Sequence, residues 1–278
     1  MSNTTAIILA AGVGSRFLPV AKAVNKCMMP LGNKPVVQYL VEDCLDAGIQ
    51  DIIIAVPKGE DTIPNHFATD EDLITALKQS GKDDIAQELE HLNQVSQHVS
   101  FCPVTYEDGH GSTVPVRAVL RQKKIDSERI LIANGDAIIA SDTSPIGEIK
   151  KALDGNDDKS GMLFGFKVPL ERRHSYGVII QDSQTHKATS ILEKPDDTVS
   201  PNSLNANVGW YLVPSSIAEY VEHTPKNEGS GEWQITDVIN AMLTDHEFVV
   251  HSIAGEYLDC GNPTSWLKAN NYLSNMIL

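Results

Sequence analysis

Short apolar runs rich in β-branched residues alternate, in the first half of the chain, with stretches whose apolar residues recur at helical spacing. Buried strands are predicted at residues 6–10, 51–56, 99–104 and 130–134. One helix is predicted at residues 35–48, and another where TVPVRAVLRQ precedes the fourth strand. Strands that alternate with helices pair in parallel through right-handed crossovers. We therefore expect an α/β fold with a Rossmann-like, doubly wound mixed sheet and flanking helices.

The pattern changes in two later stretches of the chain. Residues 65–97 are polar and mixed in charge, and their apolar positions fit two surface helices that cover the sheet or a partner subunit (Ile74, Leu77, Ile85, Leu89 and Leu92). After about residue 161, short strand patterns follow one another closely, which favours a mixed or antiparallel extension of the sheet. Helices at about 233–244 and 263–277 enclose one more strand, at 248–253. The chain is thus expected to form one domain, 1–278, with a helical insertion at about 65–97 and a C-terminal part at about 161–278.

The composition is that of an ordinary globular protein with a large core, since 41% of its 278 residues are hydrophobic. No apolar window approaches the roughly 20 residues of a membrane span, and the first residues do not resemble a signal peptide. The four cysteines are far apart and form no CxxC pair, which favours reduced, buried thiols (Cys27, Cys44, Cys102 and Cys260). These features predict a cytoplasmic protein without a membrane segment.

The formal charge of -15 argues against a nucleic-acid surface, because duplex binding requires a basic face. The charge is unevenly distributed, however. Residues 1–41 contain no Asp or Glu but include Arg16, Lys22, Lys26 and Lys34. Because a local positive excess in an acidic chain can draw a polyanion to one site, a small phosphate-bearing partner is expected here.

A glycine-containing loop, LAAGVGSRF at residues 9–17, follows the first strand inside this basic stretch. Glycines such as Gly12 and Gly14 allow a sharp turn that presents backbone N–H groups to an anion. The dinucleotide fingerprint is excluded because Phe17 stands where its third glycine belongs, and the P-loop sequence Gly-Lys-Ser/Thr is absent. The loop is either a different phosphate loop or a simple glycine turn. Asp136, which leaves a buried strand after a glycine, is likewise either a Mg²⁺ ligand or a turn cap.

The loop is the first of several motifs that occur in order along the chain. After LAAGVGSRFLPVAKAVNKCMMPLGNKPVVQYLV come NGDAII, SYGVII, LEKP, NVGWYL, GEWQITDVINAML and YLDCG. In these motifs the sequence resembles the sugar-1-phosphate nucleotidylyltransferases, and most closely their bacterial UDP-glucose pyrophosphorylase branch (UTP:glucose-1-phosphate uridylyltransferases). The resemblance covers essentially the whole chain, including the helical insertion. It implies the nucleotide-diphospho-sugar transferase form of the doubly wound fold.

The resemblance also implies a role for each matching residue on the nucleotide side. Backbone groups of three loop residues would contact the nucleotide (Ala11, Gly12 and Gly14). Arg16 would hold the departing β- and γ-phosphates, and Lys26 would reach the α-phosphate. Asp136 would bind Mg²⁺, and Asp259 in YLDCG would share or support that metal.

In the same resemblance, the part of the chain after about residue 161 binds the sugar. Gly177 and Glu193 would hydrogen-bond sugar hydroxyls, and Lys194 would hold the sugar phosphate, which places Lys194 among the catalytic residues with Arg16, Lys26 and Asp136. Val208 and Gly209 would line the same pocket.

The segment that reads the base departs from the family pattern. Tyr106 takes the place of a glutamine, Gly111 is retained, and Ser112 begins a changed pair of residues; all three are expected to bind the nucleotide. A tyrosine cannot reproduce the paired donor and acceptor of an amide, so the base is the least determined part of the prediction. Upstream, Asn25 replaces the proline that usually precedes the catalytic lysine, and Cys27 stands where relatives often carry Glu.

The function that the resemblance implies is Mg²⁺-assisted formation of UDP-glucose and pyrophosphate from UTP and glucose-1-phosphate. One alternative is the same reaction with dTTP, CTP or another hexose-1-phosphate. Another is a catalytically silent, pyrophosphorylase-like regulatory subunit, against which the joint presence of Arg16, Lys26, Asp136 and Lys194 counts. Because relatives are often dimers or tetramers, a homo-oligomer is expected.

Overall fold

The computed structural model describes residues 4–141, 144–155, 160–195 and 205–277. Its centre is a nine-stranded sheet with the order β10-β9-β11-β6-β1-β4-β5, to which β8 is added beside β11 and β12 beside β8. The strands are β1 (Thr4–Leu9), β4 (Asp51–Pro57), β5 (Val99–Val104), β6 (Arg129–Asn134), β8 (Gly161–Lys167), β9 (Gly177–Gln181), β10 (Ala188–Glu193), β11 (Asn205–Pro214) and β12 (Phe248–Ser252). The first four of these are parallel and fall where the sequence predicted strands.

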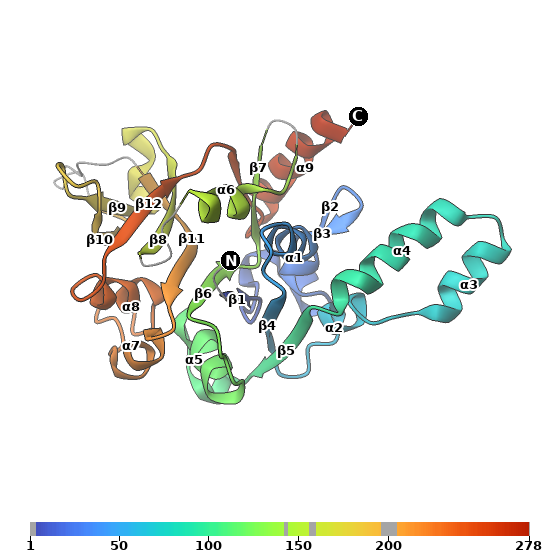
Figure 1. The fold of residues 1–278 in the computed structure, drawn as a ribbon, viewed down its shortest axis with the longest axis horizontal. Coiled ribbons are helices and arrows are strands. Elements are labelled where there is room, and N and C mark those ends of the chain that lie inside the picture. Colours follow the sequence, from blue (N-terminus) through green and yellow to red (C-terminus); the bar gives the residue numbers. More distant parts are fainter. Residues whose placement is uncertain (1–3, 142–143, 156–159, 196–204, 278) are drawn as a thin grey trace.

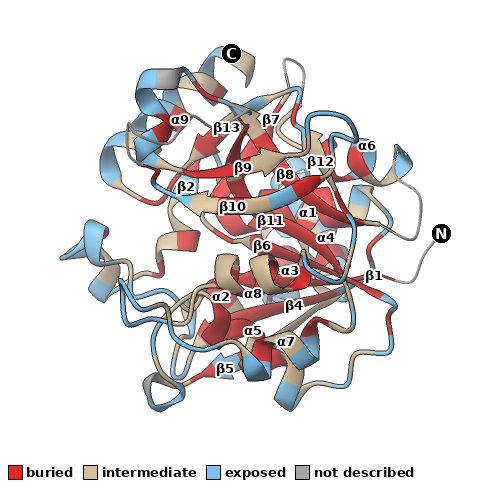
Figure 2. Cartoon of the chain, turned by 90° about the vertical axis from the view of Figure 1, so that its left-hand side faces the viewer, coloured by how far each residue is buried: buried red, intermediate tan, exposed pale blue. Residues whose placement is uncertain are grey.

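Helices cover both faces of this sheet (Figure 1). Neighbouring residues of β1 face opposite sides: Ile8 packs with α1 and α6, whereas Ile7 packs with α5, α7 and α8. These helices are α1 (Val36–Asp46), α5 (Thr113–Gln122), α6 (Glu148–Asp154), α7 (Ile217–His223) and α8 (Ile235–Met242). Burial on both sides explains why the parallel strands read as continuous apolar runs, and it leaves the strands as the buried centre in Figure 2. The predicted doubly wound α/β architecture is confirmed.

The C-terminal part extends the sheet in antiparallel fashion, as the sequence predicted. β11 is antiparallel to β6 on one side and to β8 on the other, and β9 and β10 form an antiparallel pair. The predicted strand at 248–253 is β12, and it is parallel to β8. α8 and α9 (Pro263–Ile277) are the helices expected on either side of it.

Two small sheets stand apart from the main one. β7 (Ala137–Ala140) pairs antiparallel with β13 (Glu256–Asp259), and β2 (Pro30–Leu31) pairs with β3 (Lys34–Pro35). α9 packs against both, in a separate apolar cluster centred on Leu31, Leu258 and Leu273. The described residues also contain five 3-10 turns: η1 (Ser15–Phe17), η2 (Val20–Lys22), η3 (Lys26–Met28), η4 (Tyr106–Asp108) and η5 (Leu170–Ser175).

The helical insertion contains the two predicted helices, α3 (Glu71–Gln79) and α4 (Asp83–Ser96), and a short helix, α2 (Thr62–His66), precedes them. α3 and α4 lie side by side and extend away from the body (Figure 1). Only the base of the pair joins the main core, where Val95 is buried and Leu92 packs against it. Of the two surfaces that these helices were expected to cover, the sheet or a partner subunit, they do not cover the sheet for most of their length, and Ile85 is half exposed. Among the described residues, no helix is long and apolar enough to cross a membrane.

Candidate functional site

The glycine loop leaves the carboxyl end of β1 and is held by the side chain of Asn25. The Asn25 amide donates to the Ala10 carbonyl at 2.9 Å, and its oxygen accepts from the Cys27 N–H at 2.9 Å. Gly14 adopts the left-handed conformation (φ 67°) just before η1, which a side chain would disfavour. Asn25 thus restrains, by hydrogen bonds, the backbone that a proline restrains in the family pattern.

Lys26 and Asp136 form an ion pair beside this loop. Lys26 Nζ lies 2.5 Å from Asp136 Oδ2, and the two side chains are 16% and 14% exposed. Burial lowers the pKa of Lys26, but the charge of Asp136 and the hydrogen bond to it outweigh burial, so the net pKa lies above its ordinary value. Lys26 is therefore a fixed positive charge at neutral pH. Lys26 Cε also approaches Gly12 closely, since a Cβ on Gly12 would lie 3.4 Å from it.

Asp136, Asp259 and Arg16 converge on one point beside Gly261. A Cβ placed on Gly261 would lie 2.8 Å from Asp136 Oδ2, 3.0 Å from Asp259 Oδ1 and 3.3 Å from Arg16 Nη2. The small sheet creates this arrangement, because β13 ends at Asp259 opposite Ala137, the residue after Asp136. The Cys260 N–H also donates to the Asp136 carbonyl at 2.8 Å.

The chemistry of these two carboxylates suits a hard cation. Mg²⁺ commonly takes one or two carboxylates and completes its shell with water and substrate phosphates. The described residues contain no group of three or more His, Cys, Asp or Glu that could hold a metal by themselves. Asp136 and Asp259 therefore fit a cation whose remaining ligands come from a bound phosphate.

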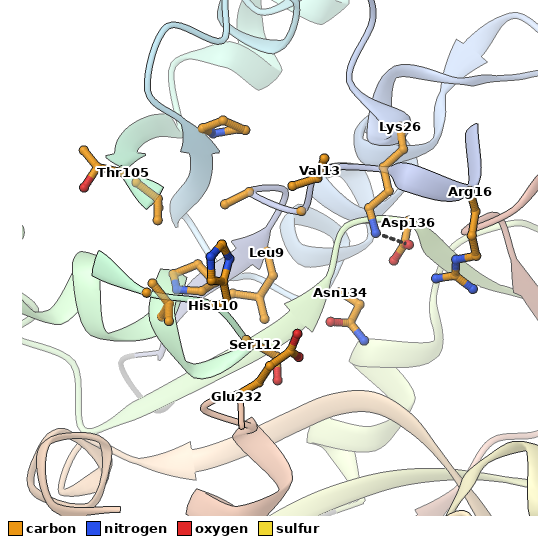
Figure 3. Close-up of a pocket in the computed structure, with 18 residues that line it drawn as sticks. Leu9, Val13, Arg16, Lys26, Thr105, His110, Ser112, Asn134, Asp136 and Glu232 are labelled. Atoms are coloured by element: carbon orange, nitrogen blue, oxygen red, sulfur yellow. Dashed lines mark hydrogen bonds and ion pairs between the residues drawn. The ribbon is translucent and has the colours of Figure 1, made fainter. Parts of the chain in front are cut away.

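Arg16, Lys26 and Asp136 line a cavity of about 480 Å³, the first pocket (Figure 3), whereas Asp259 lines a separate cavity of about 550 Å³. Seven of the predicted residues line the first pocket (Ala11, Gly12, Arg16, Lys26, Gly111, Ser112 and Asp136). Gly14 shapes the loop but does not line the cavity. Tyr106 begins η4, and its side chain lies outside the described part of the chain. Leu9, Val104 and Pro115 add apolar walls, so the first pocket has an apolar end and a charged end.

The loop that departs from the family pattern is held against Trp233 by two backbone hydrogen bonds, an arrangement that we call the Trp233 clasp. The Trp233 N–H donates to the His110 carbonyl and the Thr113 N–H donates to the Trp233 carbonyl, both at 3.0 Å. Gly111 has φ +119°, and a Cβ on it would lie 2.1 Å from the Trp233 oxygen, so only glycine fits. Arg117 and Lys226 lie over the indole, 4.9 Å and 4.3 Å from the ring centroid.

A second pocket of about 390 Å³ adjoins the first. Four residues predicted to bind sugar line it (Gly177, Glu193, Val208 and Gly209). The two pockets share Ser112, Asn134 and Glu232, so they meet at these side chains. Lys194 lies beside Glu193 without lining the cavity; it is exposed, and its N–H donates to the Tyr176 carbonyl at 3.1 Å.

Sequence reasoning missed Asn134 and His110, which line these pockets, and Trp233, which holds the loop that contains His110. Asn134 stands two residues before Asp136 at the end of β6, and this position at the carboxyl edge of the sheet was an available signal. His110 and Trp233 lie far apart in the sequence, and nothing in either motif predicts that their backbones pair.

Comparisons with known proteins all point to one family. The family described as nucleotidyl transferase matches residues 5–276. A Staphylococcus epidermidis protein named UTP–glucose-1-phosphate uridylyltransferase is 31% identical over 268 residues, which cover 95% of this chain and 89% of that protein. The structure of UTP-bound UGPase from Acinetobacter baumannii superposes with a TM-score of 0.83 at 24% identity, covering 98% of this chain and 93% of the other. A UDP-glucose pyrophosphorylase complexed with UDP-glucose gives 0.81 at 23% identity and covers 99% of both chains.

Proposed function

We propose that this chain, which belongs to the nucleotidyl transferase family, forms UDP-glucose and pyrophosphate from UTP and glucose-1-phosphate. One observation carries the proposal. The first pocket, with the Lys26–Asp136 pair on its wall, joins the second pocket through three shared residues, so two anionic substrates can meet beside these charges. The printed names of the Staphylococcus epidermidis relative and of the two structural neighbours support this choice of substrates.

The reaction needs charge neutralisation and alignment rather than a protein nucleophile. A phosphate oxygen of glucose-1-phosphate forms a bond to the α-phosphorus of UTP. The bond from that phosphorus to the bridging oxygen breaks, and pyrophosphate leaves with the electron pair. Ala11, Gly12 and Lys26 line the first pocket, where the loop N–H groups and the Lys26 ammonium would contact the phosphates, and the planar Arg16 guanidinium suits the departing β- and γ-phosphates.

Mg²⁺ is the proposed cofactor, and Asp136 and Asp259 are the residues that would hold it. When bound, it would offset negative charge on the phosphates. Lys26 would also offset charge on the phosphates. Its ammonium pairs with Asp136 and lies on the wall of the first pocket, within reach of a phosphate bound there.

The second pocket is proposed to hold the hexose. Glu193 is exposed to the cavity and its carboxylate can accept hydrogen bonds from sugar hydroxyls, while Gly177 allows close approach because a Cβ there would lie 3.0 Å from Glu193 Oε2. Val208 and Gly209, which lie on β11, also line this pocket. Lys194, next to Glu193, is proposed to hold the sugar phosphate.

The base is proposed to lie at the apolar end of the first pocket, near Gly111, Ser112 and the segment that begins at Tyr106. We also propose a cytoplasmic homo-oligomer, either a dimer or a tetramer. Exposed apolar side chains on the insertion and on α9 support an association of copies (Leu73, Ile85 and Leu267).

Pyrophosphate release with glucose-1-phosphate and Mg²⁺, measured in parallel with UTP, dTTP, CTP, ATP and GTP, tests the proposal. A strong preference for UTP is expected. Activity with another base alone would move the chain to a sister specificity. Silence with all five nucleotides and with other hexose-1-phosphates would contradict catalysis and favour the regulatory alternative.

A further inference from the structure

Asn134 occupies the junction of the two pockets, where no role has been assigned. It is the last residue of β6, and its side chain lines both cavities. Figure 3 shows the amide between Asp136 on one side and Ser112 and Glu232 on the other. A group at this position is beside any ligand that spans the two pockets.

The amide of Asn134 makes no hydrogen bond with the residues that the structure describes. Buried and half-buried amides are usually paired, because an unmet donor or acceptor is unfavourable. Here the unmet donor and acceptor face the open space of the pockets. The neighbouring Asn25 shows the contrast, since both ends of its amide are bound to backbone.

The backbone opposite is shaped to leave room for this amide. Gly209 on β11 has φ +82°, and a Cβ on it would lie 2.2 Å from Asn134 Nδ2 and 3.9 Å from Oδ1. Any side chain at position 209 would displace the amide. The Nδ2 end of Asn134 therefore lies toward the second pocket.

A neutral amide at this place matches a hydroxyl better than a phosphate. Arg16 and Lys26 already supply cations for phosphates in the first pocket, whereas the Asn134 oxygen would repel a phosphate oxygen. A hydroxyl both donates and accepts, so it can satisfy both ends of the amide. The hydroxyl-bearing rings of a nucleotide and a hexose-1-phosphate flank the phosphates that meet at this junction.

We propose that the Asn134 amide is a specificity-determining group that hydrogen-bonds a substrate hydroxyl next to the reacting phosphates, with the hexose 2-hydroxyl favoured because Nδ2 faces the second pocket. This inference rests on the proposed function. It adds a residue to that site and names the chemistry that the residue recognises.

The test compares kcat/KM of the wild type, Asn134→Ala and Asn134→Leu, with the nucleotide that the five-base panel identifies. One arm compares glucose-1-phosphate with 2-deoxyglucose-1-phosphate, and the other compares the ribonucleotide with its 2′-deoxy and 3′-deoxy forms. The variants are expected to lose about 3- to 10-fold of the discrimination against the analogue that lacks the recognised hydroxyl, the range for one neutral hydrogen bond. The ribose arm should keep its ratio.

The outcomes separate the two proposals. Loss of discrimination in the hexose arm supports the inference as stated, and loss in the ribose arm alone would reassign the hydroxyl to the nucleotide. Unchanged ratios in both arms, with any loss shared equally by parent and deoxy substrates, would overturn it. A wild type inactive with every nucleotide would instead refute the proposed function. Asn271→Ala, on the exposed side of α9, is the matched control and should keep both the wild-type rate and the ratios.

Discussion

Asp43 is a buried carboxyl whose ionisation should make the stability of the fold depend on pH. It lies on α1, 2% exposed, and its Oδ1 accepts the N–H of Gly147 at 2.7 Å, just before α6. Burial raises the pKa of Asp43 to about 7, with further increases from Asp46 and Glu148, despite hydrogen bonds from the Gly147 and Ile149 N–H groups that lower it. In Asp43→Asn the acceptor for Gly147 remains, but the group no longer titrates.

The sign and size of the effect follow from the two pKa values of this carboxyl. Because the folded state binds the proton more tightly than the unfolded state, the stabilisation is complete below pH 3.8 and is lost as pH rises toward 7. Each pKa unit corresponds to about 1.4 kcal/mol, so the full span is on the order of 4 kcal/mol. Only about half of it, roughly 2 kcal/mol, falls between about pH 5.5 and pH 8, the range that avoids the isoelectric point near 4.9.

Urea unfolding of the wild type and Asp43→Asn across that pH range measures this quantity. The difference in the free energy of unfolding, variant minus wild type, should increase by roughly 2 kcal/mol as the pH rises from about 5.5 to 8. Any constant offset from a changed hydrogen bond cancels in this comparison. Asp72→Asn, an exposed aspartate on α3 that does not contribute to the pKa of Asp43, removes the same formal charge as a control. A difference that stays flat with pH for Asp43→Asn would refute a raised pKa at this position.

Three further outcomes are expected. Asp136→Asn should reduce pyrophosphate release by about 100-fold or more, because it removes a proposed metal ligand; turnover within a few-fold of the wild type would exclude that role. The variant should still show a cooperative urea transition, although loss of the ion pair with Lys26 lowers its stability. Gly111→Ala should raise the nucleotide KM and lower the melting temperature, since its Cβ would lie 2.1 Å from the Trp233 oxygen, whereas Gly231→Ala shares a positive φ but has open space. Equal effects of the two substitutions would count against the clasp. Burial raises the pKa of Cys27 to about 12, so this thiol should resist iodoacetamide near pH 8 in the native protein and react after unfolding; equal rates would contradict it.

The parallel half of the sheet could be predicted from the sequence because its strands are buried on both faces. A run such as Ile52, Ile53 and Ile54 contributes to both core clusters, so every position is apolar and the strand is unmistakable. The small strands lack this signal. β7 and β13 have only four residues each, and their pairing joins segments far apart in the chain.

The same distinction applies to the candidate site. The glycine loop, Lys26 and Asp136 were recognisable because each sits in or beside a local motif at the carboxyl edge of the sheet. That Asp259 approaches Asp136 depends on the pairing of β13 with β7, which the sequence pattern does not encode. Asn25 was read only as a lost proline, whereas its two hydrogen bonds supply a restraint of their own.

The altered base-side loop is the clearest case of a local departure that only the tertiary structure interprets. Read alone, replacement of the residues after Gly111 leaves the identity of the base undetermined. In the fold, Ser112 Oγ accepts the Ile235 N–H at 2.9 Å, and Trp233 pairs with both His110 and Thr113. The altered loop and the GEWQITD segment are therefore joined into one hydrogen-bonded unit. Because Ser112 and Glu232 line both pockets, this unit also fixes the distance between the proposed nucleotide and sugar sites. Base preference in this chain should consequently be sought in the clasp as a whole, with Trp233 included, rather than in Tyr106 alone.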